Sequence, residues 1–191
     1  MAKKSPGKKF EESIEESCNK ENIFYDRKRD VYLPPELRGQ IPLPKNKYDC
    51  FIFAEKHLFP LELKSSGQKS VSILNADGTP NEKIIKEYQI KSLVNATAFG
   101  NIIPGLIFNF REFDNCTYFV YILDFIKYRD VLQGKSENCF KCKINKSSIS
   151  IDVCDEIGLQ IKNNLKRTNY HYFISDFIQN AIKKYGGSDL Q

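Results

Sequence analysis

Within residues 48–64, two carboxylates and one lysine lie outside the central residues 54–56, on arms that are otherwise mostly apolar. Aromatic and branched aliphatic residues on both sides of residues 54–56 predict two short strands joined by a turn. Side chains alternate between the faces of a strand, so Glu62 and Lys64 share one face of the second arm. Asp49 stands where the two arms separate and shares a face with Phe51 and Phe53.

This arrangement predicts metal-assisted hydrolysis of a phosphodiester. Mg²⁺ prefers oxygen ligands and usually takes one or two carboxylates together with waters and substrate phosphate. Asp49 and Glu62 supply two such carboxylates, and the main-chain carbonyl of Leu63 is a further candidate ligand. Lys64 can orient the attacking water or offset charge on the phosphate. The alternative is that Glu62 and Lys64 form an ordinary surface ion pair, because short Glu-x-Lys matches are common.

Composition favours a single globular domain over residues 1–191, with 41% hydrophobic and 28% charged residues. No apolar run approaches the roughly 20 residues of a membrane span, and the first residues lack the apolar segment of a signal peptide, so a cytoplasmic protein is expected. The formal net charge of +5 permits an anionic partner. Cys139 and Cys142 form the one Cys-x-x-Cys pair, without histidines at a spacing typical of zinc sites.

The N-terminal part predicts a helix, a strand and a basic segment. Ser5 and Pro6 favour a helix start, and an apolar stripe follows at helical spacing (Phe10, Ile14, Cys18). Residues 22–26 predict a short strand. Residues 27–47 contain four prolines, which exclude a helix and disfavour a central strand. This segment is either a surface loop or a stiff projection toward phosphates; its basic residues are Arg27, Lys28, Arg29, Arg38, Lys45 and Lys47.

The rest of the chain alternates helices and strands. Residues 82–98 predict a helix, with Gln89 in the middle of its apolar face, either at the rim or turned toward the polar side chains of the hairpin. Further helices are predicted at residues 124–132, 155–166 and 170–185. Strands are predicted at residues 102–110, 117–123, 139–144 and 148–153. This order predicts an α/β fold with a mixed central sheet flanked by helices.

These motifs, taken together, resemble the PD-(D/E)xK nuclease superfamily with its restriction-endonuclease-like core, and within it the RecU-type Holliday junction resolvases of Gram-positive bacteria and their phages. Asp49 and the Glu62-Leu63-Lys64 triplet match the metal-binding acids and the lysine, with Tyr48-Asp49 in place of the usual Pro-Asp. Glu11, four positions after Gly7, matches the acid of the opening helix. The remaining matches include residues 27–47 as the basic stalk, Lys69-Ser70 after the catalytic strand, Gln89 on the second core helix, and residues 105–111.

The resemblance implies a homodimeric endonuclease that makes paired nicks in four-way DNA junctions during recombination and repair. It implies Mg²⁺ or Mn²⁺ at Asp49, Glu62 and Leu63, with Lys64, Glu11 and Gln89 completing the catalytic site. The basic stalk residues, Lys69 and Ser70 are then DNA contacts. Two alternatives remain at this point: a nuclease of the same fold that acts on duplex or other branched DNA, and a catalytically inactive DNA-binding protein.

Overall fold

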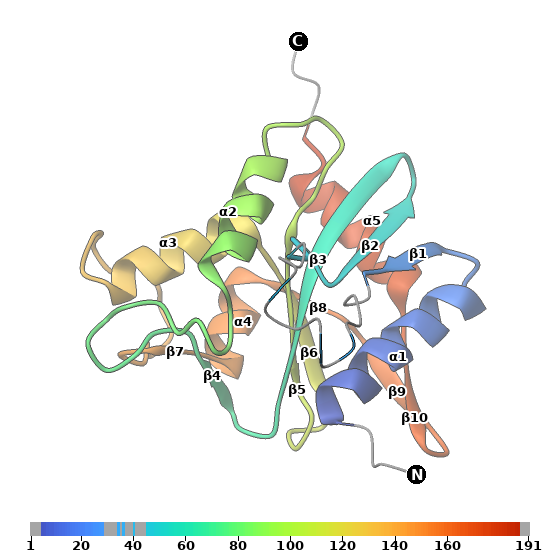
Figure 1. Ribbon diagram of the computed structural model, residues 1–191, viewed down its shortest axis with the longest axis horizontal. Helices are drawn as coiled ribbons and strands as arrows, with labels where there is room; N and C mark the ends of the chain where they lie inside the picture. The colour runs from blue at the N-terminus through green and yellow to red at the C-terminus, as the bar shows by residue number, and fades with distance from the viewer. Residues whose placement is uncertain (1–4, 29–33, 35, 37–39, 41–44, 188–191) are drawn as a thin grey trace.

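The computed structural model describes residues 5–28, 34, 36, 40 and 45–187. A six-stranded sheet runs through the middle of the molecule in the order β1-β2-β3-β5-β6-β8 (Figure 1). Strands β3 and β5 are parallel, and every other neighbouring pair in this sheet is antiparallel. The six strands are β1 (Phe24–Arg27), β2 (Cys50–Ala54), β3 (His57–Ser66), β5 (Gly105–Phe110), β6 (Cys116–Tyr121) and β8 (Leu159–Gln160).

Helices cover both faces of this sheet. In Figure 1, α2 (Glu87–Ala96), α3 (Ile122–Leu132) and α4 (Ile151–Ile157) lie on one side, and α1 (Pro6–Lys20) and α5 (Ile174–Tyr185) lie on the other. Two small two-stranded sheets complete the fold: β4 (Ser70–Ser72) with β7 (Ser148–Ser150), and β9 (Asn163–Lys166) with β10 (Asn169–Tyr172). The predicted α/β fold, with a mixed central sheet between helices, is confirmed. None of the described helices is long and apolar enough to cross a membrane.

Each face of the sheet has its own hydrophobic core. One core packs α2, α3 and α4 against one face and contains Leu106, Phe108 and Val120. The other packs α1 and α5 against the opposite face and contains Phe59 and Phe119. Alternation along β5 and β6 assigns successive residues to the two cores, which explains why these two strands are apolar along most of their length.

The first helix and the central hairpin match their predictions. Ser5 caps α1 by accepting a hydrogen bond from the Lys8 N–H (3.3 Å), and Pro6 occupies the first turn. Glu55 and Lys56 both have positive φ (49° and 63°) and form the two-residue turn between β2 and β3. Mirror-image turns of this kind suit the right-handed twist of paired strands. Because β3 is twice as long as β2, its second half extends beyond its partner.

Five predicted elements differ clearly in the structure. Residues 139–144 form no strand, residues 148–153 divide between β7 and the start of α4, and α4 ends at Ile157 rather than continuing to residue 166. The closing helix begins at Ile174, because Tyr170 belongs to β10. The helix predicted from residue 82 begins at Glu87.

Candidate active site

Asp49 is fixed by hydrogen bonds on both sides of its backbone. Its N–H donates to the Leu61 carbonyl (3.0 Å), and its carbonyl accepts from the Lys28 N–H (2.8 Å). The chain is therefore held between β1 and β3 at this residue. One oxygen of its carboxylate accepts a hydrogen bond from the Leu63 N–H (2.8 Å), which orients the side chain along the second half of β3, where β3 extends beyond β2 and pairs only with β5.

Glu62 is the central acid of the site and is almost completely buried, with 1% of its surface exposed. Each of its carboxylate oxygens accepts a different hydrogen bond. Lys64 donates to Oε1 from two residues along the same strand (2.6 Å), and Gln89 donates to Oε2 from α2 (2.6 Å). The Gln89 carbonyl oxygen in turn accepts from the Lys86 N–H at the start of α2 (3.3 Å). The amide of Gln89 therefore links Glu62 to the N-terminus of this helix, which agrees with the second of the two predicted placements.

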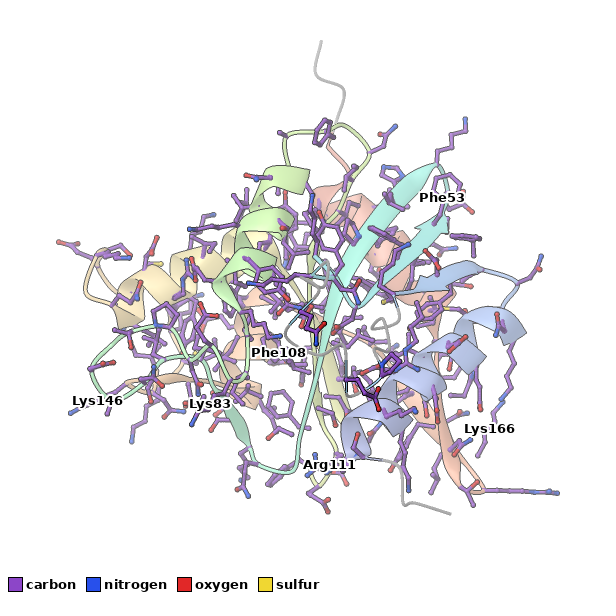
Figure 2. All side chains as sticks on the ribbon, in the orientation of Figure 1. Phe53, Lys83, Phe108, Arg111, Lys146 and Lys166 are labelled. Carbon is purple, nitrogen blue, oxygen red and sulfur yellow. The ribbon has the colours of Figure 1, made fainter. Side chains whose placement is uncertain are left out.

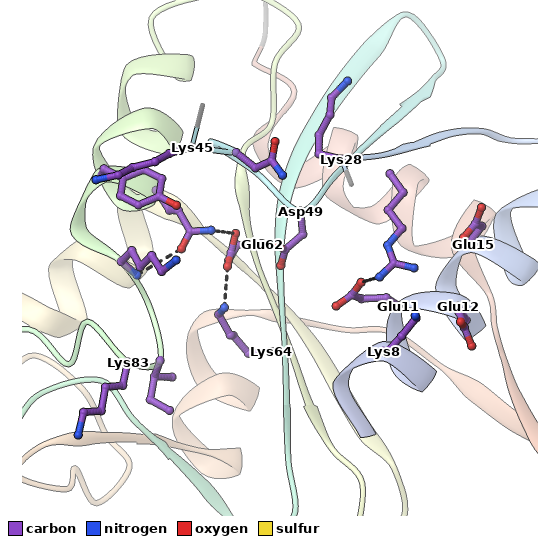
Figure 3. Close-up of a pocket in the computed structure, with 16 residues that line it drawn as sticks. Lys8, Glu11, Glu12, Glu15, Lys28, Lys45, Asp49, Glu62, Lys64 and Lys83 are labelled. Atoms are coloured by element: carbon purple, nitrogen blue, oxygen red, sulfur yellow. Dashed lines mark hydrogen bonds and ion pairs between the residues drawn. The ribbon is translucent and has the colours of Figure 1, made fainter. Parts of the chain in front are cut away.

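Burial is the main cause of an unusual titration of Glu62. The pKa of its carboxyl group rises from an ordinary value of 4.5 to about 7, because desolvation disfavours the charged form. The Lys64 ammonium lowers this pKa, and the neighbouring Asp49 carboxylate raises it. Asp49 and Glu62 lie near one another in the same cleft (Figure 3). The Glu62–Lys64 pair is thus part of a buried cluster rather than an isolated surface ion pair.

Glu11 reaches the same site from α1, across the cleft from Glu62. Its carboxylate forms an ion pair with Arg27 of β1. Burial raises the pKa of Glu11, and the Arg27 guanidinium opposes this effect. Asp49 also raises this pKa and Lys64 lowers it, so the Glu11 carboxylate experiences both groups of the hairpin.

A cleft of about 980 Å³ opens over these acids, between α1 and the segment that leads into α2 (Figure 3). It brings together Glu11, Asp49, Glu62, Lys64 and Gln89, all five of the residues predicted to be catalytic. Cationic side chains line the same cleft, namely Lys8, Arg27, Lys28, Lys45, Lys64, Lys83 and Lys86. The acids therefore occupy a cleft whose lining is rich in positive charge, which suits a polyanionic substrate in contact with a cation site.

Comparison with known proteins places the chain in a family. It is 42% identical over 184 residues to the SPbeta prophage-derived uncharacterized protein YotM of Bacillus subtilis (strain 168), covering 96% of this chain and 90% of that protein. The chain belongs to the YotM family. No family model matches it.

Among solved structures, this member of the YotM family is similar to Hjc from Archaeoglobus fulgidus, a Holliday junction resolvase from an archaeal hyperthermophile. The alignment covers 81% of this chain and 95% of that one, with 15% identity and a TM-score of 0.44. We therefore infer the function of the YotM-family chain from the side chains of its own cleft.

Some of the predicted DNA contacts line the cleft and others lie outside it. Arg27, Lys28 and Lys45 line the cleft; the Lys28 ammonium lies 5.0 Å from the centre of the Phe51 ring, and that of Lys45 lies 5.3 Å from Tyr88. Other predicted contacts lie elsewhere. Lys47 and Lys69 are exposed and, like Ser70 at the start of β4, are not among the residues that line the cleft, while Arg29 and Arg38 fall outside the described residues.

The residues of the cleft that the sequence analysis missed include three lysines and one tyrosine. Lys8 lies in the first turns of α1, and Lys83, Lys86 and Tyr88 lie at or just before the start of α2. The sequence signal was present for Lys8, because it is one turn before Glu11 on the same helix. It was hidden for Lys83 and Lys86, because the predicted helix began before them whereas α2 begins at Glu87.

The donor set fits a magnesium-type ion. Among the described residues, no three or more His, Cys, Asp and Glu side chains are grouped as a metal site. Asp49 and Glu62 nevertheless provide the one or two carboxylates that Mg²⁺ commonly takes while it retains several waters. Oxygen ligands without thiolate or imidazole favour Mg²⁺ or Mn²⁺ over zinc or copper. In this member of the YotM family, the two carboxylates are the residues that would hold the ion.

Proposed function

We propose that the protein is a metal-dependent endonuclease that nicks branched DNA, with four-way junctions as its main substrate. One observation carries this proposal: a buried glutamate, hydrogen-bonded by a lysine and a glutamine, adjoins an aspartate at the bottom of a cation-lined cleft. Carboxylates beside a lysine are the groups that hydrolysis of a phosphodiester requires, and the surrounding cations suit the polyanion.

Each side chain has a distinct role in this proposal. Asp49 and Glu62 hold a divalent cation, with the Leu63 carbonyl as a further oxygen ligand. When bound, the cation lowers the pKa of a water ligand and stabilises negative charge on the phosphate. Lys64 orients the attacking water or offsets the developing charge. Gln89 and Glu11 act as positioning residues, since Gln89 fixes the rotamer of Glu62 and Glu11 faces the site from α1.

The lysines and arginine of the cleft contact phosphates rather than bases. Such contacts set the position of the DNA and make its affinity depend on salt, without reading its sequence. Recognition by the shape of the branch point follows from this composition. Lys69 and Ser70 would contact DNA beyond the cleft, together with the basic residues between β1 and β2.

The RecU-type resemblance supports a homodimer, because paired nicks in two strands of like polarity need two active sites related by a two-fold axis. The prophage-derived relative supports a phage or Gram-positive bacterial source, and hence action on DNA in the bacterial cytoplasm during recombination or repair.

The test is a nicking assay on an end-labelled four-way junction with Mg²⁺, Mn²⁺ or EDTA. We expect paired symmetric nicks with either metal, none with EDTA, and at least a 100-fold loss of rate in Asp49→Asn and Glu62→Gln. Glu137→Gln, which changes an exposed carboxylate, is the matched control. Unchanged nicking in either active-site variant would show that the site is wrongly assigned.

A linear duplex of the same sequence is the companion substrate in this assay. Equal cleavage of both substrates would identify a duplex nuclease of the same fold. Metal-independent binding of the junction, with no product in either metal, would identify a DNA-binding protein without catalysis.

A further inference from the structure

The face of the sheet that carries the two acids continues beyond the cleft. Asp49, Phe51 and Phe53 alternate along β2 with residues buried in the core under α1, so their side chains share the face of Glu62. In the antiparallel register, Phe24 of β1 is directly opposite Phe53. Directly opposite residues have Cβ atoms about 5 Å apart and lie on the same face. The two side chains therefore leave the sheet at paired positions on one face, at the end remote from the acids.

These two rings are exposed in a way that ordinary core residues are not. Phe24 is 60% exposed and Phe53 is 50% exposed, and neither belongs to the two cores. Phe53 projects from the β2–β3 hairpin in Figure 2. Two large exposed rings side by side are unusual on a protein surface without a binding role.

Aromatic residues connect the exposed pair to the active site. Phe51 lies between Phe53 and Asp49 on β2, and its ring meets Tyr48 edge-on at 5.2 Å. The Lys28 ammonium lies over the Phe51 ring and also lines the cleft. We refer to Tyr48, Phe51, Phe53 and Phe24 as the aromatic strip. It starts beside the first metal-binding acid and ends at the exposed pair.

The length of the strip matches a short run of nucleotides. Asp49 and Phe53 are four residues apart on one strand, which corresponds to about 13 Å at roughly 3.3 Å per residue. Stacked nucleotides of one DNA strand advance by about 3.4 Å. An unstacked strand advances by at least this distance per nucleotide, so a strand whose phosphate lies over Asp49 and Glu62 would reach the exposed rings within about four nucleotides.

We propose that the exposed pair, Phe24 and Phe53, is a stacking platform for unpaired bases of the DNA strand that occupies the cleft. This inference rests on the proposed function, because the cleft must first bind a nucleic acid. Every base has a flat π-face, so aromatic rings bind unpaired bases without sequence preference. Continuity with the cation-lined cleft favours nucleic acid over a protein partner. The platform selects DNA in which bases are unstacked, such as a branch point or a single strand.

The experiment measures binding in EDTA, so that cleavage is not required. The probes are an oligothymidylate, a four-way junction and a blunt duplex. The double variant Phe24→Ala/Phe53→Ala is compared with Leu165→Ala, which truncates a similarly exposed apolar side chain on β9. We expect the double variant to bind the oligothymidylate and junction at least about five-fold more weakly, the lower end of the effect of one base–aromatic stack. Its affinity for the blunt duplex should change less than about two-fold.

Two further variants identify the type of contact. Phe53→Tyr should retain binding, while Phe53→Leu, which keeps apolar bulk without a π-face, should lose it. The salt dependence of binding should be unchanged in both, because no phosphate contact is removed, whereas Lys28→Ala should reduce its slope by about one. With 5-iododeoxyuridine in the single strand, irradiation should cross-link the DNA to Phe53 or Phe24.

The outcomes separate this inference from the proposed function. Equal weakening on blunt duplex, or full binding by Phe53→Leu, would overturn the platform. A change of molecular mass by light scattering, with DNA affinity unaltered, would show that the rings form a protein interface instead. Both proposals are supported if Asp49→Asn loses nicking and Phe24→Ala/Phe53→Ala binds the oligothymidylate and the junction more weakly. If the parent protein does not nick the junction but the double variant still binds the single strand and the junction more weakly, only the proposed nuclease activity is overturned.

Discussion

Glu62→Gln should stabilise the metal-free protein at alkaline pH, although the glutamate is central to the site. The amide has nearly the same shape as the carboxylate and can still accept the hydrogen bond from Gln89. It carries no charge, so the desolvation that raises the pKa of Glu62 no longer has an ionised form to penalise. Removal of a proposed catalytic residue thus produces a more stable fold.

The magnitude follows from the pKa. A rise from 4.5 to about 7 corresponds to about 3 kcal/mol between the two protonation states. Because the pKa in the folded state is above that in the unfolded state, the contribution of Glu62 to the stability of the parent is greatest below about pH 4.5 and is lost as the pH rises through about 7. The attraction of Lys64 is already included in the raised pKa. For a chain of this size, about 3 kcal/mol equals roughly 6–12 °C in melting temperature.

The assay is urea or thermal unfolding in EDTA at about pH 4.5 and at about pH 8.5, on parent and variant. At each pH, the free energy of unfolding of the parent is subtracted from that of the variant. The change in this difference between the two pH values reports Glu62 alone, since the titration of all other groups cancels. We expect the variant to gain about 3 kcal/mol relative to the parent between these two pH values. If the difference in free energy of unfolding is the same at both pH values, Glu62 is not a buried acid with a raised pKa.

Three further predictions follow from the same contacts. At about pH 8, Mg²⁺ or Mn²⁺ should raise the melting temperature of the parent but not of Asp49→Asn, measured by thermal unfolding at several metal concentrations. Gln89→Ala leaves Glu62 Oε2 without its partner and should lower stability by about 1–3 kcal/mol by urea unfolding; nicking should fall with it, and unchanged values of both would contradict the positioning role. Lys83→Ala and Lys86→Ala should each reduce the salt slope of junction binding by about one, in anisotropy titrations, without altering the pH profile of nicking.

Local patterns predicted the hairpin and the first helix well. The hairpin is specified by alternation within residues 48–64, and α1 by a cap and a stripe that are all within one segment. Asp49, Glu62 and Lys64, three of the residues proposed to be catalytic, were therefore found from the hairpin pattern, and Glu11 was found on the predicted helix through the resemblance. Gln89 was found through the resemblance and through its position in the middle of an apolar face.

The elements that were predicted wrongly depend on contacts between distant residues. Residues 139–144 alternate as a strand would, because Phe140, Cys142 and Ile144 pack on the core, but the Lys141 and Cys142 N–H groups donate to the Glu156 carboxylate instead of to a strand. In α5, the first N–H groups donate to Glu21 from the end of α1. A pattern within one segment does not contain these partners.

The helix predicted over residues 155–166 ends early for a steric reason. A Cβ atom at Gly158 would be only 2.6 Å from the carbonyl oxygens of both Cys154 and Phe119. The chain therefore passes against β6 at this glycine and continues into β8. The close approach involves a strand that is some forty positions earlier, so the sequence pattern alone favoured continuation of the helix.

The hydrogen bond from Lys28 to the carbonyl of Asp49 has an evolutionary consequence. It joins Lys28, which directly follows β1, to Asp49, which directly precedes β2. The two residues that flank residues 29–48 are therefore adjacent. Residues inserted, deleted or exchanged between these two residues need not shift the aspartate. Relatives can thus diverge in this segment while Asp49, Glu62 and Lys64 stay in place, and under the proposed function such divergence would change the DNA shapes that they accept. Replacing residues 29–48 with the corresponding residues of YotM would test whether that segment determines which DNA substrate is bound.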